Sequence, residues 1–303
     1  MKEVYFKGGF VPFKEAKIGV MTHAFNYGTG VFEGIRGYWN AKKGQMYILK
    51  MAEHYERLIK SCNILKINPG KTVDEMCRIT IDLVKRNGYK EDIYIRPIAY
   101  KSSEVIGLGL TGLKDDILVY LAPFGDYLDI SKGIRVCVST WTRISDNMIP
   151  ARAKITGVYV NSSLAKAEAK ENGYDEAVML SADGHVAEGS GENIFIVRKN
   201  EIITPPLHHD ILEGITRSSV IDLLREEMKV GVIERLIDRT ELYIADEIFF
   251  TGTGAQVSPV IEIDKRKVGT GSVGKITAKV QKLYFDAVKG ENPKYSAWLT
   301  PAY

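Results

Sequence analysis

Two short turns rich in glycine and threonine combine the donors that a phosphate group requires. The segment GIT at residues 214–216 stands directly before the helical pattern RSSVIDLLREE, and TGTG at residues 251–254 follows the strand pattern EIFF. Unpaired backbone N–H groups at a helix start attract anions, and threonine hydroxyls add further donors. Thr216 fits an ordinary helix N-cap as well, and that is the commoner use of such a residue. The turns predict a phosphate site without naming its ligand.

A carboxylate with a chemical use is indicated by the string EGSGEN, in which Glu188 precedes three small residues and the strand pattern NIFIV. A buried carboxylate needs a cation or hydrogen-bond donors, and a protonated pyridine ring would be one such partner. A polar turn with a solvated glutamate explains the same string, and composition favours it. Because Lys and Arg together number 41, composition singles out no catalytic lysine. The residues alone therefore indicate a small-molecule enzyme with a phosphate site.

Two strings match the GxGxxG pattern, but neither predicts a nucleotide site. The first, GLGLTG at residues 107–112, leads into a strand pattern, whereas a dinucleotide site needs a helix start. The second, GTGSVG at residues 269–274, opens a helix and resembles a P-loop with Lys275. However, Ile276 stands where the magnesium-binding Ser or Thr is required.

Charge and residue spacing exclude several other classes of protein. The formal net charge of +3 is too small to indicate a nucleic-acid partner. No apolar run is long enough for a membrane span, and the charged N-terminus does not resemble a signal peptide, so we expect a cytoplasmic protein. The three cysteines are far apart and the five histidines are scattered, which predicts no disulfide framework and no metal site.

Strand and helix patterns alternate along the 303 residues and indicate an α+β protein. The opening VYFKGGFVPF predicts a hairpin, and Thr72 with Glu75 forms a capping box at the start of an amphipathic helix. A polar, glycine-containing stretch after Phe124 separates two apolar strand patterns. We therefore expect a small N-terminal α/β domain at 1–124, an interdomain loop at 125–133 and a larger C-terminal domain at 134–303.

Several strings resemble, in order and over nearly the whole chain, the branched-chain amino acid aminotransferases of class IV. These are HAFNYGTGVFEGIR, YIRP, AKITGVYVNSS, AEGSGEN, LEGITR and LYIADEIFFTGTGAQVSPV. The resemblance implies the pyridoxal-phosphate fold type IV, with two α/β domains, the larger of which has a pseudo-barrel sheet and binds pyridoxal 5′-phosphate. It also implies transamination of branched-chain L-amino acids with 2-oxoglutarate by a ping-pong mechanism.

The same resemblance implies a role for individual residues. Lys154 matches the Schiff-base lysine and is the catalytic residue, while Glu188 would hold the pyridine nitrogen protonated. The cofactor-binding set is Arg57, Lys154, Tyr159, Glu188, Leu212, Gly214, Ile215, Thr216, Gly252 and Thr253. The substrate-binding set is Tyr27, Phe32, Gly34, Tyr94, Arg96, Phe124, Tyr127, Thr253 and Gly254.

The chain departs from the family's pattern in two places that affect the expected pocket. KITGVY replaces a frequent KAGGNY, and Phe124 stands where tryptophan is frequent. A D-amino acid or (R)-amine aminotransferase of the same fold is the alternative activity, and an aminodeoxychorismate lyase is a more distant one. YIRP and VFEGIR favour the branched-chain interpretation. The expected partners are amino and 2-oxo acids and, by family analogy, further copies of the chain in a homodimer or higher homo-oligomer.

Overall fold

The computed structural model describes residues 1–125 and 128–303, and the chain divides into two units. The first unit contains Met1–Gly125, Ala153–Val158 and Ala287–Tyr303, and the second contains Asp126–Arg152 and Tyr159–Asp286. The segments 153–158 and 287–303 therefore differ from the sequence expectation, which placed them in the C-terminal domain. Hydrogen bonds explain the difference, because Ile155 bridges Val31 and strand β17 (Leu299–Pro301) pairs with β5 (Gln45–Leu49).

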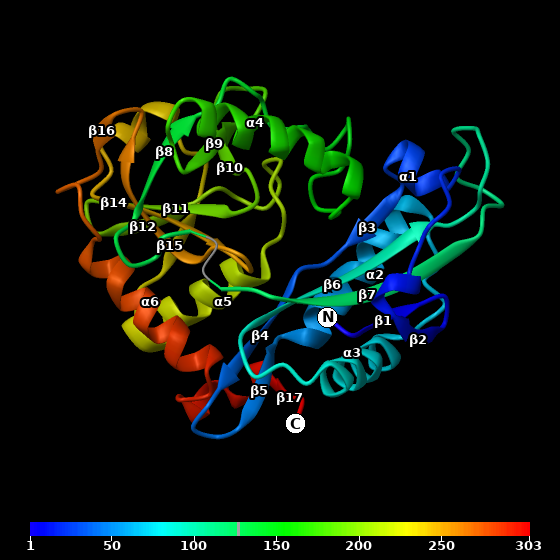
Figure 1. Cartoon of the computed structure of the whole chain (residues 1–303). Helices are drawn as coiled ribbons and strands as arrows, with labels where there is room; N and C mark the ends of the chain where they lie inside the picture. Colours follow the sequence, from blue (N-terminus) through cyan, green and yellow to red (C-terminus); the bar gives the residue numbers. More distant parts are fainter. Residues whose placement is uncertain (126–127) are drawn as a thin grey trace. The chain divides into compact units, whose positions relative to one another are not determined.

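The first unit is built on an antiparallel sheet in the order β17-β5-β4-β6-β7-β1-β2, with β3 paired to β6 (Figure 1). Its other strands are β1 (Glu3–Phe6), β2 (Gly9–Pro12), β3 (Gly30–Phe32), β4 (Ile35–Asn40), β6 (Ile93–Lys101) and β7 (Asp115–Pro123). Its helices are α1 (His23–Tyr27), α2 (Met51–Leu65) and α3 (Val73–Asn87), with 3-10 turns η1 (Phe13–Glu15), η2 (Thr156–Val158) and η5 (Pro293–Trp298).

Local signals in the first unit act as the sequence predicts. β1 and β2 form the expected hairpin, in which Gly8 has a φ of +83° that favours glycine. Thr72 and Glu75 form both hydrogen bonds of the capping box at the start of α3. The string VFEGIRGYW reads as one continuous strand pattern but forms two strands, because it is interrupted between β3 and β4 at Glu33 and Gly34. That interruption turns the Glu33 carboxylate toward α2.

The second unit is a mixed sheet in the order β10-β9-β8-β15-β14-β11-β12-β13, with β16 paired to β15. Its strands are β8 (Ile134–Val138), β9 (Glu176–Leu180), β10 (Val186–Gly189), β11 (Asn193–Arg198), β12 (Glu201–Thr204), β13 (Val232–Glu234), β14 (Glu247–Gly252), β15 (Gln256–Ile263) and β16 (Arg266–Lys267). Its helices are α4 (Tyr159–Glu171), α5 (Ile215–Leu223) and α6 (Lys275–Val288), with a π-helical turn η3 (Leu224–Met228) and a 3-10 turn η4 (Arg239–Tyr243). The last residues of α6 belong to the first unit.

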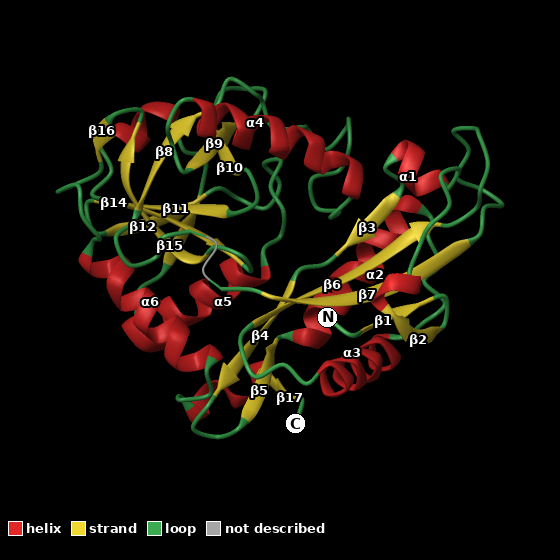
Figure 2. Ribbon diagram, viewed as in Figure 1, coloured by secondary structure: helices red, strands yellow, loops and turns green. Residues whose placement is uncertain are grey.

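This second sheet curls until its two edges meet, as expected for a pseudo-barrel. The backbone N–H of Val186 in β10 donates to the carbonyl of Ile237, a few residues after β13, at 2.9 Å. His185 and Asp238 form an isolated bridge beside that contact. Figure 2 shows strands and helices in separate colours.

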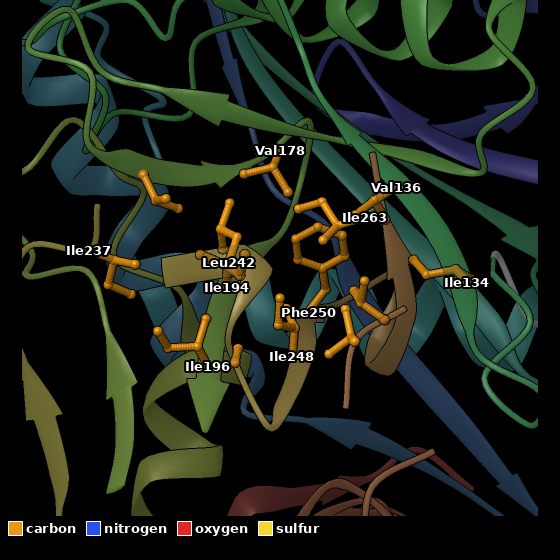
Figure 3. Close-up of a cluster of buried hydrophobic side chains, with 14 of the residues drawn as sticks. Ile134, Val136, Val178, Ile194, Ile196, Ile237, Leu242, Ile248, Phe250 and Ile263 are labelled. Atoms are coloured by element: carbon orange, nitrogen blue, oxygen red, sulfur yellow. The ribbon is translucent and has the colours of Figure 1, made fainter. Parts of the chain in front are cut away.

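Alternate side chains of the curled sheet fill its interior. Ile194 and Ile196 of β11 and Ile248 and Phe250 of β14 point into one cluster of buried side chains (Figure 3). The residues between them point the other way, where the rings of Phe195 and Phe249 stack at 5.0 Å. This period of two is what an antiparallel pair with both faces covered requires.

Within the residues that the structure describes, no helix is both long and apolar enough to cross a lipid bilayer.

Candidate functional site

Lys154 is held in the first unit by β3 and α2. Its carbonyl accepts the N–H of Phe32 at 2.9 Å, and its own N–H donates to Oγ of Ser61 on α2 at 3.2 Å. The Lys154 Nζ atom lies 5.1 Å from the centre of the Phe32 ring. Hydrogen bonds of the Lys154 backbone on both sides therefore fix the position of its Cα atom, and its amine lies against an aromatic face.

Arg57 on α2 is paired with a carboxylate that the sequence analysis did not identify. Nε and Nη2 of Arg57 donate to the two carboxylate oxygens of Glu33 at 2.7 and 2.8 Å. Nδ1 of His54 lies 2.7 Å from Oε2 of the same carboxylate. The bidentate pair fixes the plane of the guanidinium, which is the geometry that phosphate recognition uses.

Charge and burial determine the protonation of this group. Glu33 is fully buried, which alone would raise its pKa, but the charge of Arg57 and hydrogen bonds from His54 and Arg57 hold the pKa well below its usual value. Burial lowers the pKa of His54, against the opposing effect of Glu33. At neutral pH the group is therefore a carboxylate, a guanidinium and a neutral imidazole. The spacing of His54 and Arg57 on one helix face was the available sequence signal.

Five residues of the predicted substrate set lie in one cluster of the first unit. Nη2 of Arg96 donates to the hydroxyl of Tyr94 at 2.9 Å, and the Arg96 guanidinium lies 4.3 Å from the centre of the Phe32 ring. The Tyr94 ring is 5.0 Å from that of Phe124. A Cβ on Gly34 would come within 2.0 Å of the Tyr94 hydroxyl, so this position requires glycine.

Arg96 is a partly buried cation that forms no ion pair with a carboxylate of its own unit. Its Nε atom is buried without a hydrogen-bond partner, and no ion pair of Arg96 occurs among the residues described. Tyr27 lies elsewhere in the first unit, where its hydroxyl accepts the N–H of Gly107 at 3.2 Å. Tyr127, also assigned to the substrate set, lies outside the described residues.

Glu188 lies in β10 of the second unit. A polar turn with a solvated glutamate is ruled out, because this residue is only 5% exposed. Nη2 of Arg143 is 2.8 Å from its Oε1 atom. Oε2 accepts the side-chain N–H of Asn193 and the backbone N–H of Leu212, both at 3.1 Å. Sequence reasoning identified this carboxylate but missed Arg143, which is far away in the chain.

Asn193 joins Glu188 to the segment that leads into α5. Its side-chain N–H also donates to the carbonyl of Leu212 at 2.9 Å, and a Cβ on Gly214 would lie 1.9 Å from its Oδ1 atom. Gly214 is the N-cap of α5, with no side-chain hydrogen bond to the helix. The commoner use of threonine predicts that Thr216 is the N-cap. The structure shows instead that Thr216 is a buried residue in the first turn of the helix. The uncapped N–H groups of Ile215 and Thr216 suit an anion.

The TGTG turn lies beside Asn193, because Thr251 in β14 pairs with Asn193 in β11. Thr251 is fully buried, and among the described residues its Oγ1 atom has no hydrogen-bond partner. Gly252 ends β14, and Thr253 and Gly254 form the following turn, where they are partly exposed. Tyr159, the first residue of α4, is also partly buried.

The two GxGxxG strings are not nucleotide sites. Residues 107–112 connect the antiparallel strands β6 and β7. At the start of α6, the carboxylate of Glu247 accepts the N–H groups of Ile276 and Thr277 at 3.0 and 2.8 Å. A carboxylate therefore takes the position that a nucleotide phosphate would need.

Comparison with known proteins identifies the family. The model of the amino-transferase class IV family matches residues 30–263. The chain belongs to the class IV aminotransferases. It is 51% identical to a probable branched-chain-amino-acid aminotransferase of Aquifex aeolicus (strain VF5), over 100% of this chain and 97% of that one. Pyridoxal 5′-phosphate is the cofactor of this class.

Two solved structures share the whole fold of this aminotransferase. The branched-chain aminotransferase of Thermoproteus uzoniensis, solved with norvaline, is 45% identical with a TM-score of 0.95, and 99% of each chain is covered. The branched-chain amino acid aminotransferase of Thermobaculum terrenum, solved in its pyridoxal-phosphate form, is 40% identical with a TM-score of 0.95. That match covers 100% of this chain and 98% of the other.

Proposed function

We propose that this enzyme transfers the amino group of leucine, isoleucine or valine to 2-oxoglutarate, by a ping-pong use of pyridoxal phosphate. The observation that carries the proposal is the pairing of Arg96 with Tyr94 and the ring of Phe32. A partly buried guanidinium without a carboxylate partner in its unit, on an aromatic wall, suits a pocket that accepts an aliphatic side chain in one half-reaction and the distal carboxylate of glutamate in the other.

The chain's residues fit the cofactor. The uncapped start of α5 and the unpartnered Thr251 hydroxyl supply donors for a phosphate, and the glycine required at position 214 keeps the backbone there open. When bound, pyridoxal phosphate supplies an electron-withdrawing ring that stabilises negative charge at the substrate's α-carbon. In the first unit, Arg57, oriented by Glu33, is proposed as a phosphate ligand. In the second unit, the same role is proposed for Ile215, Thr216 and Thr253.

Three further residues complete the proposed assignment. Lys154 Nζ would attach the cofactor and, once displaced by the substrate amine, would carry the proton between the substrate α-carbon and the C4′ atom of the cofactor. Glu188 would hold the proton on the pyridine nitrogen, and its bonds from Arg143 and Asn193 keep its oxygens oriented for this. Leu212 would pack on the ring, and Tyr159 would hydrogen-bond the ring hydroxyl. Gly252 and Gly254 would bring backbone N–H groups to the phosphate and the α-carboxylate.

The visible spectrum of the holoenzyme tests this function directly. We expect a cofactor band that is bleached by L-leucine and by L-glutamate and restored by 2-oxoglutarate, while D-alanine leaves it unchanged. Lys154→Ala should lose this band and all measurable turnover while remaining folded, because no other group supplies both the attachment and the proton transfer. Lys170→Ala, on the exposed face of α4, is the matched control. A response to D-alanine alone would favour a D-amino acid aminotransferase, and turnover by Lys154→Ala would remove this lysine from the mechanism.

The chain is also proposed to form a homo-oligomer through an exposed apolar surface of the first unit. His23 Nε2 lies 2.8 Å from the carbonyl of Gly107, and Thr22 bridges Glu104, so α1 and the residues before it lie beside the loop between β6 and β7. Their exposed apolar side chains are Val20, Met21, Phe25, Val105, Ile106 and Leu108. An apolar patch of this kind is typical of a protein interface.

Light scattering after size exclusion tests the oligomer. We expect Ile106→Glu combined with Leu108→Glu to yield a smaller species than the wild type, whereas Ile64→Glu on α2 should not. A wild-type chain that is monomeric at micromolar concentration would refute the proposal.

A cytoplasmic location is proposed from the three free cysteines, since reduced thiols are typical of that compartment. Burial raises the pKa of Cys62 to about 12 and that of Cys77 and Cys137 to about 11. These thiols are therefore packing groups and not nucleophiles. Fractionation of the native cells, with the enzyme followed by antibody, tests the location.

A further inference from the structure

A cluster of metal-binding side chains lies in the second unit, formed by Asp183, His185 and His209. One ligand atom from each of the three lies within 4.8 Å of the other two. Asp183 and His185 are on the turn between β9 and β10, and His209 is in the loop between β12 and α5. The two histidines come from separate segments, which explains why sequence spacing predicted no metal site.

The distances in this cluster suit a small divalent ion. Nδ1 of His185 lies 3.1 Å from one carboxylate oxygen of Asp183, and Nε2 of His209 lies 3.6 Å from the other. A tetrahedral zinc ion with bonds of about 2.0–2.1 Å places its ligand atoms about 3.3–3.4 Å apart. The two imidazole rings meet at 80° and do not stack. Small adjustments of the side chains would therefore complete the geometry.

The facing ring nitrogens lack other partners. Among the described residues, neither Nδ1 of His185 nor Nε2 of His209 has a hydrogen bond, and both atoms are buried. The His209 side chain is nine-tenths buried, at 10% exposure. Buried polar atoms are normally satisfied, so two unsatisfied nitrogens aimed at one carboxylate indicate a missing ligand.

A second carboxylate stands behind one of the histidines. Oδ1 of Asp238 lies 3.4 Å from Nε2 of His185, the ring nitrogen that points away from the cluster. Metal-binding histidines commonly have a carboxylate at their other nitrogen, which fixes the tautomer and strengthens the ligand. Asp238 lies beside His185 because these two residues form the bridge that closes the curled sheet.

We propose that Asp183, His185 and His209 bind a divalent transition-metal ion, with water in the remaining position. Two imidazole nitrogens and a carboxylate oxygen are ligands that suit Zn²⁺. The ion joins the β9–β10 turn to the loop that continues through Leu212 and Gly214 into α5. Its role is structural, and its presence does not depend on the proposed transamination.

Calorimetric titration of tag-free holoenzyme, treated with a chelator and then dialysed, tests the site with ZnCl₂. We expect one ion per chain. His185→Gln and His209→Gln should weaken binding by more than about 100-fold, and Asp238→Asn by about 10–100-fold. His208→Gln is the matched control, because His208 is adjacent in the chain but exposed, and it should bind as the wild type does.

Cobalt provides an independent readout. Co²⁺ in place of zinc should give a visible absorption typical of tetrahedral nitrogen and oxygen ligands, which His209→Gln should abolish and His208→Gln should not. If His209→Gln fails to fold, Asp183→Ala, which changes a half-exposed side chain, carries the test. The proposal is wrong if the wild type binds no ion, or if zinc binds the His208 and His209 variants equally. Turnover of leucine is measured separately, so failure of the metal site leaves the transaminase proposal unaffected.

Discussion

Glu33 in the first unit and Glu192 in the second are both buried glutamates, yet their pKa values shift in opposite directions. Glu33 has Arg57 and His54 at hydrogen-bond distance, and its pKa falls. Glu192 accepts a hydrogen bond from the backbone N–H of Gly191, but burial together with the charge of Glu176 raises its pKa. Burial is common to the two, so the charge of the neighbours decides which of them ionises.

The same comparison extends to the charges assigned to the cofactor. In the first unit a buried carboxylate, Glu33, orients the cation Arg57, and in the second a buried cation, Arg143, orients the carboxylate Glu188. Each unit therefore neutralises its own buried functional charge by an opposite one. Substituting the orienting partner, Glu33 or Arg143, should therefore show how much the stability of each unit depends on that charge.

The largest effect is expected for Arg143→Met. It leaves Glu188 as a buried carboxylate without its guanidinium, and breaking such a pair from one side costs about 3–5 kcal/mol of stability. Urea unfolding of the variant should show this loss. Arg152→Met, which removes an exposed arginine of the same unit, should change stability by less than about 1 kcal/mol. Equal effects of the two substitutions would show that Glu188 does not need its partner.

Arg96→Met tests a cation that has no carboxylate partner in its own unit. The distal carboxylate of glutamate would lose its partner, a change of about 2–5 kcal/mol for truncated charge pairs, whereas leucine makes no such contact. Single-turnover spectroscopy should show a selective loss in the glutamate and 2-oxoglutarate half-reaction. Equal losses in both half-reactions, or lower stability with neither changed, would mean that Arg96 only supports the sheet.

Glu33→Gln should cost about 1.5–3 kcal/mol at neutral pH, because it weakens hydrogen bonds to a charged group. Since the pKa of Glu33 is lowered on folding, its stabilisation is present above its unfolded pKa of about 4.3 and is lost as the pH falls through the folded value. The difference in the free energy of unfolding between wild type and variant should therefore become smaller at acidic pH. Cofactor dissociation should also become faster, as Arg57 loses its orientation. Glu56→Gln, an exposed neighbour of Arg57, is the control for both measurements.

The smallest effect is expected for Glu192→Gln, and it has the opposite sign. A carboxyl group whose pKa is raised on folding stabilises the protein fully below its unfolded pKa and loses that contribution as the pH rises through the folded value. The glutamine variant should therefore be more stable than wild type in alkaline solution, by on the order of 1 kcal/mol, and similar near pH 4. Thermal unfolding midpoints of variant and wild type, measured from about pH 4 to alkaline pH, test this difference in stability. Glu201→Gln, which changes an exposed side chain, is the control. A variant less stable at every pH would show that Glu192 is ionised.

Sequence reasoning succeeded where the interaction is local or the motif is specific. The capping box of Thr72 and Glu75 spans three residues, and its chemistry is decided by those residues alone. The P-loop resemblance failed at Ile276, and the structure adds the physical reason, which is the Glu247 carboxylate at the start of α6. The assignment of the family likewise rested on strings long enough to exclude chance.

The orienting partners could not be predicted, because the contacts that define them join distant parts of the chain. Glu33 and Arg57 are separated by 24 positions, and Arg143 and Glu188 by 188 − 143 = 45. A glutamate inside the apolar string VFEGI was a signal of burial, but nothing in the string names its partner. The same holds for His185 and His209, whose proximity depends on the turn after β9 and the loop after β12.

The pairing of β17 with β5 has a consequence for biosynthesis. The first unit lacks the strand beside β5 until the ribosome has released residues 299–301, whereas every residue of the second unit has already been made by Asp286. The unit that is started first can therefore be finished last, with the β5 edge open to other chains in the interval. Released chains that are truncated after residue 290 should consequently resist protease in the second unit and remain dependent on chaperones in the first.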